Sequence, residues 1–219
     1  MTRDAIGRLR RLDSCVVSDA LDRLSLEGAL GAFRRWGRGG VVAGRVTTVA
    51  LRAGSAPKVG AHLGVGALAA AGPDHVIVVA NQGRTEAGAW GGLLTLRAHL
   101  LGVAGVIVDG ALRDIDEVEA LDVAVFARAA TPRTARGRFH EVATDAVVRV
   151  EGVEVAPGSL VVADGSGVVF VRREDLNAVL PVAEEIAARE STMAKALRAG
   201  SQGAEILGSD YELMLERET

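Results

Sequence analysis

Apolar and polar positions alternate in two different rhythms through the middle of the chain. Runs that are apolar almost throughout cover residues 75–81 (HVIVVAN), 105–110 (GVIVDG) and 123–128 (VAVFAR). Between them, residues 91–102 and 113–121 space their apolar positions as helices do. Fully apolar strands that alternate with short helices predict right-handed βαβ crossovers and a parallel sheet covered on both faces.

The segment before this core predicts two helices, a strand and a third helix. Residues 5–12 and 18–24 have helical apolar spacing, and Ser18 is the expected N-cap of the second helix. Residues 44–54 are rich in β-branched side chains, which favours a strand. Residues 59–72 are rich in small residues and predict a tightly packed helix.

After the core the pattern changes to hairpins and then to helices. Residues 146–155 and 159–174 predict paired strands that turn at glycine-containing positions. From residue 176 to residue 219 the spacing is helical. We therefore expect an α/β domain over residues 1–175 and a helical extension over 176–219, which packs on the same domain or on a neighbouring subunit.

Composition narrows the class of protein. The 219 residues are 49% hydrophobic, enough for one globular domain with a real core. A formal net charge of −3 lacks the basic excess expected of a nucleic-acid binder. The single cysteine, Cys15, excludes an intrachain disulfide and is expected to be a small buried residue.

The amino-terminal stretch is charged and has no apolar signal-peptide core, and no segment has the roughly 20 apolar residues that cross a bilayer. These features predict a cytoplasmic protein without membrane partners.

Two loops follow neighbouring strands of the predicted parallel sheet. One covers residues 81–92 (NQGRTEAGAWGG) and the other residues 109–114 (DGALRD). Ligands of open parallel sheets bind outside the carboxyl ends of the strands, where such loops lead into helices. The sequence therefore predicts a site where these two loops meet.

The residue types in the two loops suit a small oxo acid and a divalent cation. The stretch from Gly91 to Leu94 opens a helix, so its backbone N–H groups can bind an anion. Arg113 offers a planar fork for a carboxylate, and Asp114 offers an oxygen ligand for Mg²⁺ or Mn²⁺. The plainer alternative is that Asp114 caps its own helix, that Arg113 is solvated and that the two glycines form a tight turn.

Four stretches of the sequence resemble the RraA-like family, which contains a ribonuclease E activity regulator and class II 4-hydroxy-4-methyl-2-oxoglutarate aldolases. These stretches are LDSCVVSDALDRL, AWGGLLTLRAHLLGVAGVIVDGALRDIDEV, VFARAATPRTARGRF and VEVAPGSLVVADGSGVVFVRRED. Together they extend over roughly residues 10–175, and the block around residues 90–117 is the most specific part.

The resemblance implies a homotrimer, or a multiple of it, of α-β-β-α sandwiches with a central, mostly parallel, swivel-like sheet and sites between protomers. It implies a divalent-metal-dependent carbon–carbon lyase that cleaves or decarboxylates a small 2-oxo acid through a pyruvate enolate, with Mg²⁺ or Mn²⁺ and no organic cofactor. A glutamate from the neighbouring subunit's C-terminal helix also reaches the site in the aldolases; Glu190 is the best match by chain distance, with Glu184 and Glu185 as alternatives. The implied residues are Arg113, Asp114 and Glu190 for catalysis, Asp114 for the metal, and Gly91, Gly92, Leu93, Leu94 and Arg113 for the substrate.

One position departs from the lyase pattern. Lyase members carry an acidic residue twenty-one positions before the arginine, where this sequence has Gly92. In the family this carboxylate supports proton transfer, and Glu86 in the same loop is a candidate substitute. The alternative function is therefore a non-catalytic, trimeric interaction protein of the ribonuclease-regulator kind, with a degenerate site and a protein partner.

Two other kinds of enzyme fit the sequence less well. A Schiff-base aldolase needs a buried lysine, but Lys58 lies in a small-residue loop and Lys195 on a polar terminal helix. The spacing of the four histidines is not that of a zinc site; these are His62, His75, His99 and His140. Trp90 either walls the anion loop or packs in the core.

Overall fold

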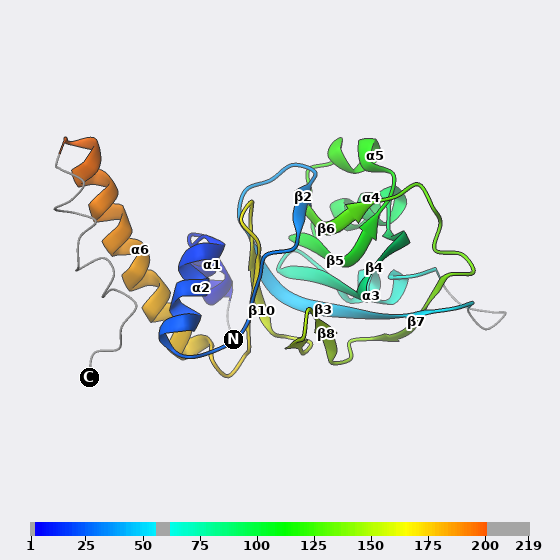
Figure 1. The fold of residues 1–219 in the computed structure, drawn as a ribbon, viewed down its shortest axis with the longest axis horizontal. Coiled ribbons are helices and arrows are strands. Elements are labelled where there is room, and N and C mark those ends of the chain that lie inside the picture. Colours follow the sequence, from blue (N-terminus) through cyan, green and yellow to red (C-terminus); the bar gives the residue numbers. More distant parts are fainter. Residues whose placement is uncertain (1–2, 56–61, 201–219) are drawn as a thin grey trace.

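A sheet with a parallel centre forms the middle of the molecule. The computed structural model describes residues 3–55 and 62–200 (Figure 1). Four strands pair in parallel and in sequence order, as the apolar runs predicted. They are β3 (Val42–Ala53), β4 (His75–Trp90), β5 (Gly105–Leu112) and β6 (Val125–Ala130). All eight residues of β5 are buried, because the sheet is covered on both faces at this strand.

Three helices connect these strands and cover one face of the sheet (Figure 1). They are α3 (Val65–Ala70), α4 (Gly92–Leu100) and α5 (Ile115–Glu119). Their buried side chains form one apolar cluster with strand residues such as Ile77, Val79 and Val108. This layer positions the amino ends of α4 and α5 beside the carboxyl ends of β4 and β5.

Antiparallel strands flank the parallel centre, so the whole sheet is mixed. On one side β10 (Leu160–Ala163) pairs with β3, followed by β11 (Val168–Val171) and β1 (Ala29–Leu30). On the other side β2 (Arg34–Trp36) pairs with β6. The strand β7 (Phe139–Thr144) pairs with the second half of β3, on the same edge as β10. A separate hairpin consists of β8 (Val148–Val150) and β9 (Val153–Val155).

The sheet curls on itself and gives the α-β-β-α layering that was expected. Side chains of the central strands, such as Val76 and Ile107, share an apolar cluster with Val161 and Phe170 of β10 and β11. The opposite side of β10 and β11 faces a third cluster with the helices α1 (Arg3–Leu9), α2 (Ser14–Arg23) and α6 (Leu176–Arg198). Figure 1 shows these helices at one end of the molecule and α3 to α5 at the other.

Three local predictions need correction. The second helix begins at Ser14, because the side chain of Asp13 accepts the N–H of Val16 at 2.8 Å and caps it, so Ser18 lies inside the helix. The loop expected over residues 81–92 is instead, up to Trp90, the second half of β4, which shifts register against β5 at three places. Cys15 is exposed rather than buried, since it lies on the outer side of α2.

The remaining helical predictions hold in part. The helix expected over residues 59–72 is confined to Val65–Ala70, and residues 59–61 lie outside the described part. The C-terminal prediction corresponds to α6 up to Arg198, whereas residues 201–219 lie outside the described part. None of the helices in the described ranges is long and apolar enough to cross a lipid bilayer.

Candidate functional site

The two predicted loops meet at the ends of β4 and β5. Trp90 pairs with Leu112 in the last rung of the ladder, and the N–H of Arg113 donates to the carbonyl of Trp90 at 3.1 Å. The chain then enters α4 at Gly92 and α5 at Ile115. The amino ends of both helices are therefore fixed next to each other by main-chain hydrogen bonds.

Asp114 points at the neighbouring helix and not at its own. Its side chain makes no capping hydrogen bond within α5, although it occupies the N-cap position. Instead, Oδ2 accepts the backbone N–H of Gly92 at 3.2 Å, and Oδ1 accepts Nε of Arg113 at 3.1 Å. The alternative that Asp114 simply caps its own helix is therefore wrong.

The backbone of Asp114 has a conformation that few side chains adopt. Its φ of 58° and ψ of 48° lie in the left-handed region. Aspartate and asparagine tolerate this region better than other residues with a Cβ, and such conformations concentrate at functional sites. The turn aims the carboxylate back across the amino end of α4.

Arg113 lies over two glycines that leave room for its side chain. A Cβ at Gly88 would come within 2.9 Å of its Cγ, and a Cβ at Gly91 within 2.8 Å of the same atom. Among the described residues only Nε of this guanidinium has a hydrogen-bond partner, so its two terminal NH₂ groups are left for an anion. The side chain is 37% exposed, which leaves it accessible to a ligand.

The amino end of α4 is held by a buried tryptophan. Nε1 of Trp90 donates to the hydroxyl of Thr95 at 3.0 Å, and that hydroxyl donates to the carbonyl of Gly91 at 2.9 Å. Trp90 is 2% exposed, so it packs in the core and does not wall a pocket. The first N–H groups of α4, at Gly92, Leu93 and Leu94, lie at this fixed end.

Glu117 also belongs to this cluster, although the sequence did not single it out. A Cβ placed on Gly92 would overlap its Oε2 and lie 3.2 Å from the Cβ of Asp114. The carboxylate of Glu117 therefore occupies the space that Gly92 leaves open. Its position three residues after Asp114, on the same face of a helix, is a signal that the sequence already contained. Glu86, the candidate substitute, is exposed on β4.

The helix α6, which carries the candidate glutamates, packs against α1 and α2 at the opposite end of the molecule from α4 and α5 (Figure 1). Glu184 is bound by Arg8, with Nε 2.7 Å from Oε1. Glu185 pairs with Arg23 and Arg189. Burial, with a smaller effect of the negative charges of Asp13 and Asp19, raises the pKa of Glu190. Within one chain, the structure does not bring these glutamates to Arg113 and Asp114.

The residues of the rival chemistries do not form a site in the described part of the chain. Lys58 lies outside that part, and Lys195 is exposed on α6. Nε2 of His75 lies 2.7 Å from Nη2 of Arg45, and His140 contacts the carbonyl of Gly54. Residues 3–55 and 62–200 contain no group of three or more histidine, cysteine or acidic side chains that could hold a metal ion.

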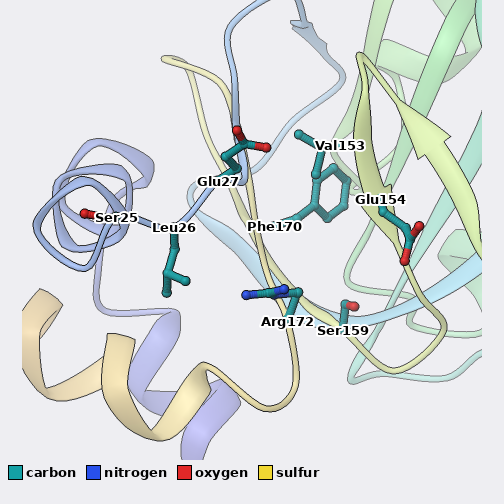
Figure 2. A pocket seen from close by; sticks show the side chains of 8 residues that line it. All are labelled: Ser25, Leu26, Glu27, Val153, Glu154, Ser159, Phe170 and Arg172. Carbon is teal, nitrogen blue, oxygen red and sulfur yellow. The ribbon is translucent and has the colours of Figure 1, made fainter.

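A separate cavity lies elsewhere in the described part of the chain. It has a volume of about 350 Å³ and is open between the end of α2 and the β8–β9 hairpin (Figure 2). Figure 2 shows Arg172, Glu154 and Phe170 among the side chains that line it. Arg172 is already paired with Asp175 at 2.6 Å. We place the candidate site at Arg113 and Asp114, because main-chain donors, a guanidinium and carboxylates converge there and not in this cavity.

Comparison with known proteins gives the class of this chain. Residues 14–170 match the model of the RraA-like family, described as Aldolase/RraA, and the chain therefore belongs to this family. Over 133 residues it is 32% identical to the uncharacterized protein MJ0644 of Methanocaldococcus jannaschii, covering 60% of this chain and 63% of that protein. Over 101 residues it is 38% identical to the 4-hydroxy-4-methyl-2-oxoglutarate aldolase of Thermus thermophilus. This match covers 46% of this chain and 60% of that protein. The chain thus spans less than two thirds of the length of either relative.

Solved structures confirm the fold. An uncharacterized protein from Pseudomonas syringae pv. tomato superposes with a TM-score of 0.85 at 27% identity, over 95% of this chain and 98% of that one. RraAS2 of Streptomyces coelicolor is described as an unusual member of the RNase ES inhibitor RraA protein family. It superposes with a TM-score of 0.79 at 25% identity, over 88% of this chain and 96% of that one. The relatives thus include a protein described as an aldolase and a member of a ribonuclease-inhibitor family, so the activity has to be argued from the site.

Proposed function

We propose that this chain is a divalent-metal-dependent carbon–carbon lyase that acts on a small 2-oxo acid through a pyruvate enolate. The observation that carries the proposal is the meeting of Arg113, Asp114 and the amino end of α4, held together by two hydrogen bonds to the Asp114 carboxylate. The identification of a Thermus thermophilus relative as an aldolase agrees with this class of reaction.

The residues present fit Mg²⁺ or Mn²⁺ better than a tightly bound metal. Mg²⁺ is usually held by one or two carboxylates together with solvent and substrate oxygens, and seldom by an all-protein cage. Asp114 meets this requirement: each carboxylate oxygen accepts one hydrogen bond and keeps a second lone pair. A Cβ at Gly91 would come within 2.8 Å of Oδ2, so the glycine keeps that oxygen accessible. When bound, a divalent cation polarises the 2-oxo group and stabilises the enolate charge.

The chain's own groups bind and orient the substrate. The two terminal NH₂ groups of Arg113, which have no hydrogen-bond partner among residues 3–55 and 62–200, form a planar fork that suits a carboxylate. The N–H groups of Leu93 and Leu94 lack partners inside α4 and attract negative charge at the same end. A small 2-oxo acid carries a carboxylate next to its carbonyl group. Its carboxylate fits Arg113 and the amino end of α4, and its carbonyl oxygen fits a cation held by Asp114.

Oxaloacetate is the substrate that best suits a site without an acid at position 92. Both retro-aldol cleavage and decarboxylation leave the pyruvate enolate. Only retro-aldol cleavage requires a base that removes a hydroxyl proton from the departing half. Because Gly92 supplies no such base, we expect oxaloacetate to turn over faster than 4-hydroxy-4-methyl-2-oxoglutarate.

A homotrimer, or a multiple of it, would complete the site. Glu190 has no route to Arg113 within its own chain, so its catalytic role requires a neighbouring subunit. An apolar stripe on α4 begins at the site itself and faces away from the core. It consists of Leu93, Leu96 and Leu100, which are 80%, 41% and 67% exposed. Exposed leucines at helical spacing favour burial against another subunit.

The test measures pyruvate release from oxaloacetate and from 4-hydroxy-4-methyl-2-oxoglutarate, with Mg²⁺ or Mn²⁺ added to the purified chain. Free cations decarboxylate oxaloacetate by themselves, so the rate without protein is subtracted. The expected result is turnover that chelation removes and that Asp114→Ala loses. Turnover of neither substrate above the protein-free rate would refute the lyase.

One observation favours a second function, the binding of a ribonuclease. Gly92 removes the acid that lyase members carry, and a structural relative is described as belonging to an RNase ES inhibitor family. This function predicts inhibition of purified ribonuclease E or ES on an RNA substrate, with no pyruvate release. An unchanged cleavage rate at a tenfold molar excess of the chain would count against it.

A further inference from the structure

The cavity between the end of α2 and the β8–β9 hairpin is built on fixed main chain. Its volume of about 350 Å³ lies within the range of small-molecule sites, which is roughly 300–1,000 Å³. The chain leaves α2 in a hydrogen-bonded turn, in which the N–H of Leu26 donates to the carbonyl of Leu21 at 2.9 Å. The N–H of Phe170 then donates to the carbonyl of Gly28 at 2.9 Å, which joins this turn to β11. The cavity is therefore preformed.

Ser159 is a buried polar residue that lines this cavity (Figure 2). It is 4% exposed, and its hydroxyl has no hydrogen-bond partner among residues 3–55 and 62–200. Because Leu160 pairs with Val171, the register of β10 and β11 places Ser159 opposite Arg172, just beyond the paired residues. A buried hydroxyl without a hydrogen bond is unfavourable, so Ser159 points to a polar ligand group in the cavity.

Carboxylates outnumber guanidinium groups around the cavity. Glu27 and Glu154 are among its lining residues. Arg172 also lines it, but its Nε lies 2.6 Å from Asp175 and 4.0 Å from Glu174. The hydrogen bond with Asp175, followed by the charges of Asp175, Glu174 and Glu154, raises the pKa of Arg172, so its positive charge is matched within the chain. The carboxyl end of α2 adds negative partial charge at the same wall.

We propose that this cavity binds a small organic ammonium ion with an apolar body. The ammonium group has three donors, which suit the carboxylates of Glu27 and Glu154 and the hydroxyl of Ser159. The apolar body packs against Leu26 and Phe170, which also line the cavity.

Arg149 does not remove this preference for a cation. It lies 3.9 Å from Glu154, but both side chains are largely exposed, so solvent screens the pair. A cavity that holds only solvent makes a different prediction, since it would not distinguish a charged ligand from a neutral one of the same shape.

The first experiment titrates the full chain with 2-phenylethylamine and with 2-phenylethanol by calorimetry. The two compounds share one apolar body, and only the amine is charged at pH 7. We expect the amine to bind at least about tenfold more tightly, which corresponds to one charge-assisted hydrogen bond. Equal dissociation constants for the two compounds, or no binding of the amine, would overturn the proposal.

The second experiment removes the carboxylates one at a time. Glu27→Gln and Glu154→Gln keep the shape of each side chain, and each should raise the dissociation constant of the amine about fivefold or more. Glu119→Gln is the matched control, because Glu119 is exposed on α5, outside the cavity. An amine affinity in both cavity variants equal to that of the control would overturn the assignment of the charge.

Ser159→Ala separates ligand binding from folding. The hydroxyl makes no hydrogen bond in the described part of the chain, so its removal should leave the unfolding free energy within about 0.5 kcal/mol of the parent. The amine should bind several-fold more weakly. A variant that loses stability and keeps the parental amine affinity would show a structural role for Ser159 and contradict its place in the site.

Val153→Trp tests the location, because a larger side chain at this lining position fills the cavity. It should abolish amine binding, whereas Val147→Trp, at a position that is 58% exposed, should keep it. Melting temperatures verify that both variants fold, and the exposed Glu27→Gln tests the same cavity if Val153→Trp does not. Equal amine affinity in the two tryptophan variants would place the ligand elsewhere and overturn the proposal.

This inference is independent of the proposed lyase, since the lining of the cavity includes neither Arg113 nor Asp114. Binding of the amine without pyruvate release would support the cavity and refute the lyase. Pyruvate release without binding of the amine would do the reverse.

Discussion

The backbone N–H of Gly92 donates to Oδ2 of Asp114 over 3.2 Å, although 22 positions separate the two residues. This bond joins the amino end of α4 to the turn that starts α5. The bond holds the carboxylate of Asp114 beside the amino end of α4, which attracts anions, and beside the guanidinium of Arg113. The left-handed backbone of Asp114 is what turns its side chain toward α4 rather than along α5.

Asp114→Asn should separate the fold of this turn from its chemistry. Asparagine tolerates the left-handed conformation and its amide oxygen can accept the Gly92 N–H, so we expect a change in unfolding free energy within about 1 kcal/mol. The charge is lost, so the Mn²⁺ dissociation constant should rise at least about tenfold. Calorimetric titration and urea denaturation measure the two quantities. Parental Mn²⁺ affinity in this variant would rule out Asp114 as a ligand.

Gly88→Ala should impair substrate binding and spare the cation. The new Cβ would come within 2.9 Å of Cγ and 3.1 Å of Cδ of Arg113, so the guanidinium has to move. We expect a higher KM for oxaloacetate with Mn²⁺ affinity unchanged, because Asp114 does not touch this position. Arg113→Lys should also raise the KM for oxaloacetate, since lysine lacks the planar fork of the guanidinium. An unchanged KM in both variants would exclude Arg113 from substrate binding.

Much of the fold followed from the sequence, because the period of apolar positions reports burial directly. The runs at residues 75–81, 105–110 and 123–128 became the parallel strands β4, β5 and β6. The curl of the sheet was not readable in this way. It depends on β10 pairing with β3 across more than a hundred residues, and no local pattern encodes such a contact.

The site was predicted in its parts but not in its geometry. Arg113, Asp114 and Gly92 could be named because loops after adjacent parallel strands share one edge of the sheet. The direction of the Asp114 side chain depends on a backbone conformation that composition does not reveal. Glu117 was missed because its relation to Gly92 exists only after α4 and α5 have packed together.

Asp164 should couple the stability of the chain to acid pH. Its carboxylate accepts the N–H and the hydroxyl of Ser14, both at 2.7 Å, and the N–H of Ser166 at 2.9 Å. Burial acts to raise the pKa of Asp164, but these hydrogen bonds outweigh it and hold the pKa below its usual value. The stabilisation is therefore present above the unfolded-state pKa of about 3.9, and it is lost as pH falls through the lower folded-state pKa.

Asp164→Asn removes the charge from this contact, and we expect it to lower the unfolding free energy at pH 7 by about 2 kcal/mol. The difference from the parent should shrink as pH falls below the unfolded-state pKa of about 3.9, because the parent then progressively loses the stabilisation that its charged carboxylate provides. Urea denaturation from pH 3 to pH 7 measures both, with the exposed Asp116→Asn as control. A difference that stays constant over this range would contradict the assignment.

Arg128 should be essential for stability because it neutralises a buried acid. Asp109 is 1% exposed, and its Oδ1 lies 2.6 Å from Nε of Arg128. The same arginine also pairs with Glu151 through Nη1. Removing the cation leaves a buried charge without a partner, so Arg128→Ala should cost about 3–5 kcal/mol. Arg149→Ala, which breaks the exposed pair with Glu154, should cost less than about 1 kcal/mol. Equal losses in the two variants, measured by denaturant unfolding, would contradict this prediction.

The stripe on α4 should hold subunits together if the site is shared between chains. Leu96 and Leu100 are 41% and 67% exposed, and a leucine buried in an interface contributes about 1.5–3 kcal/mol. The double variant Leu96→Glu with Leu100→Glu keeps good helix formers and should dissociate the assembly. Light scattering measures the mass of the assembly. The parent should have three times the chain mass of 22.7 kDa, or a multiple of that value, and the variant should have the mass of one chain. Val142→Glu, on the exposed side of β7, is the control that should keep the parental mass. A parent that runs as a single chain would leave Glu190 without a partner site and remove it from the proposed catalysis.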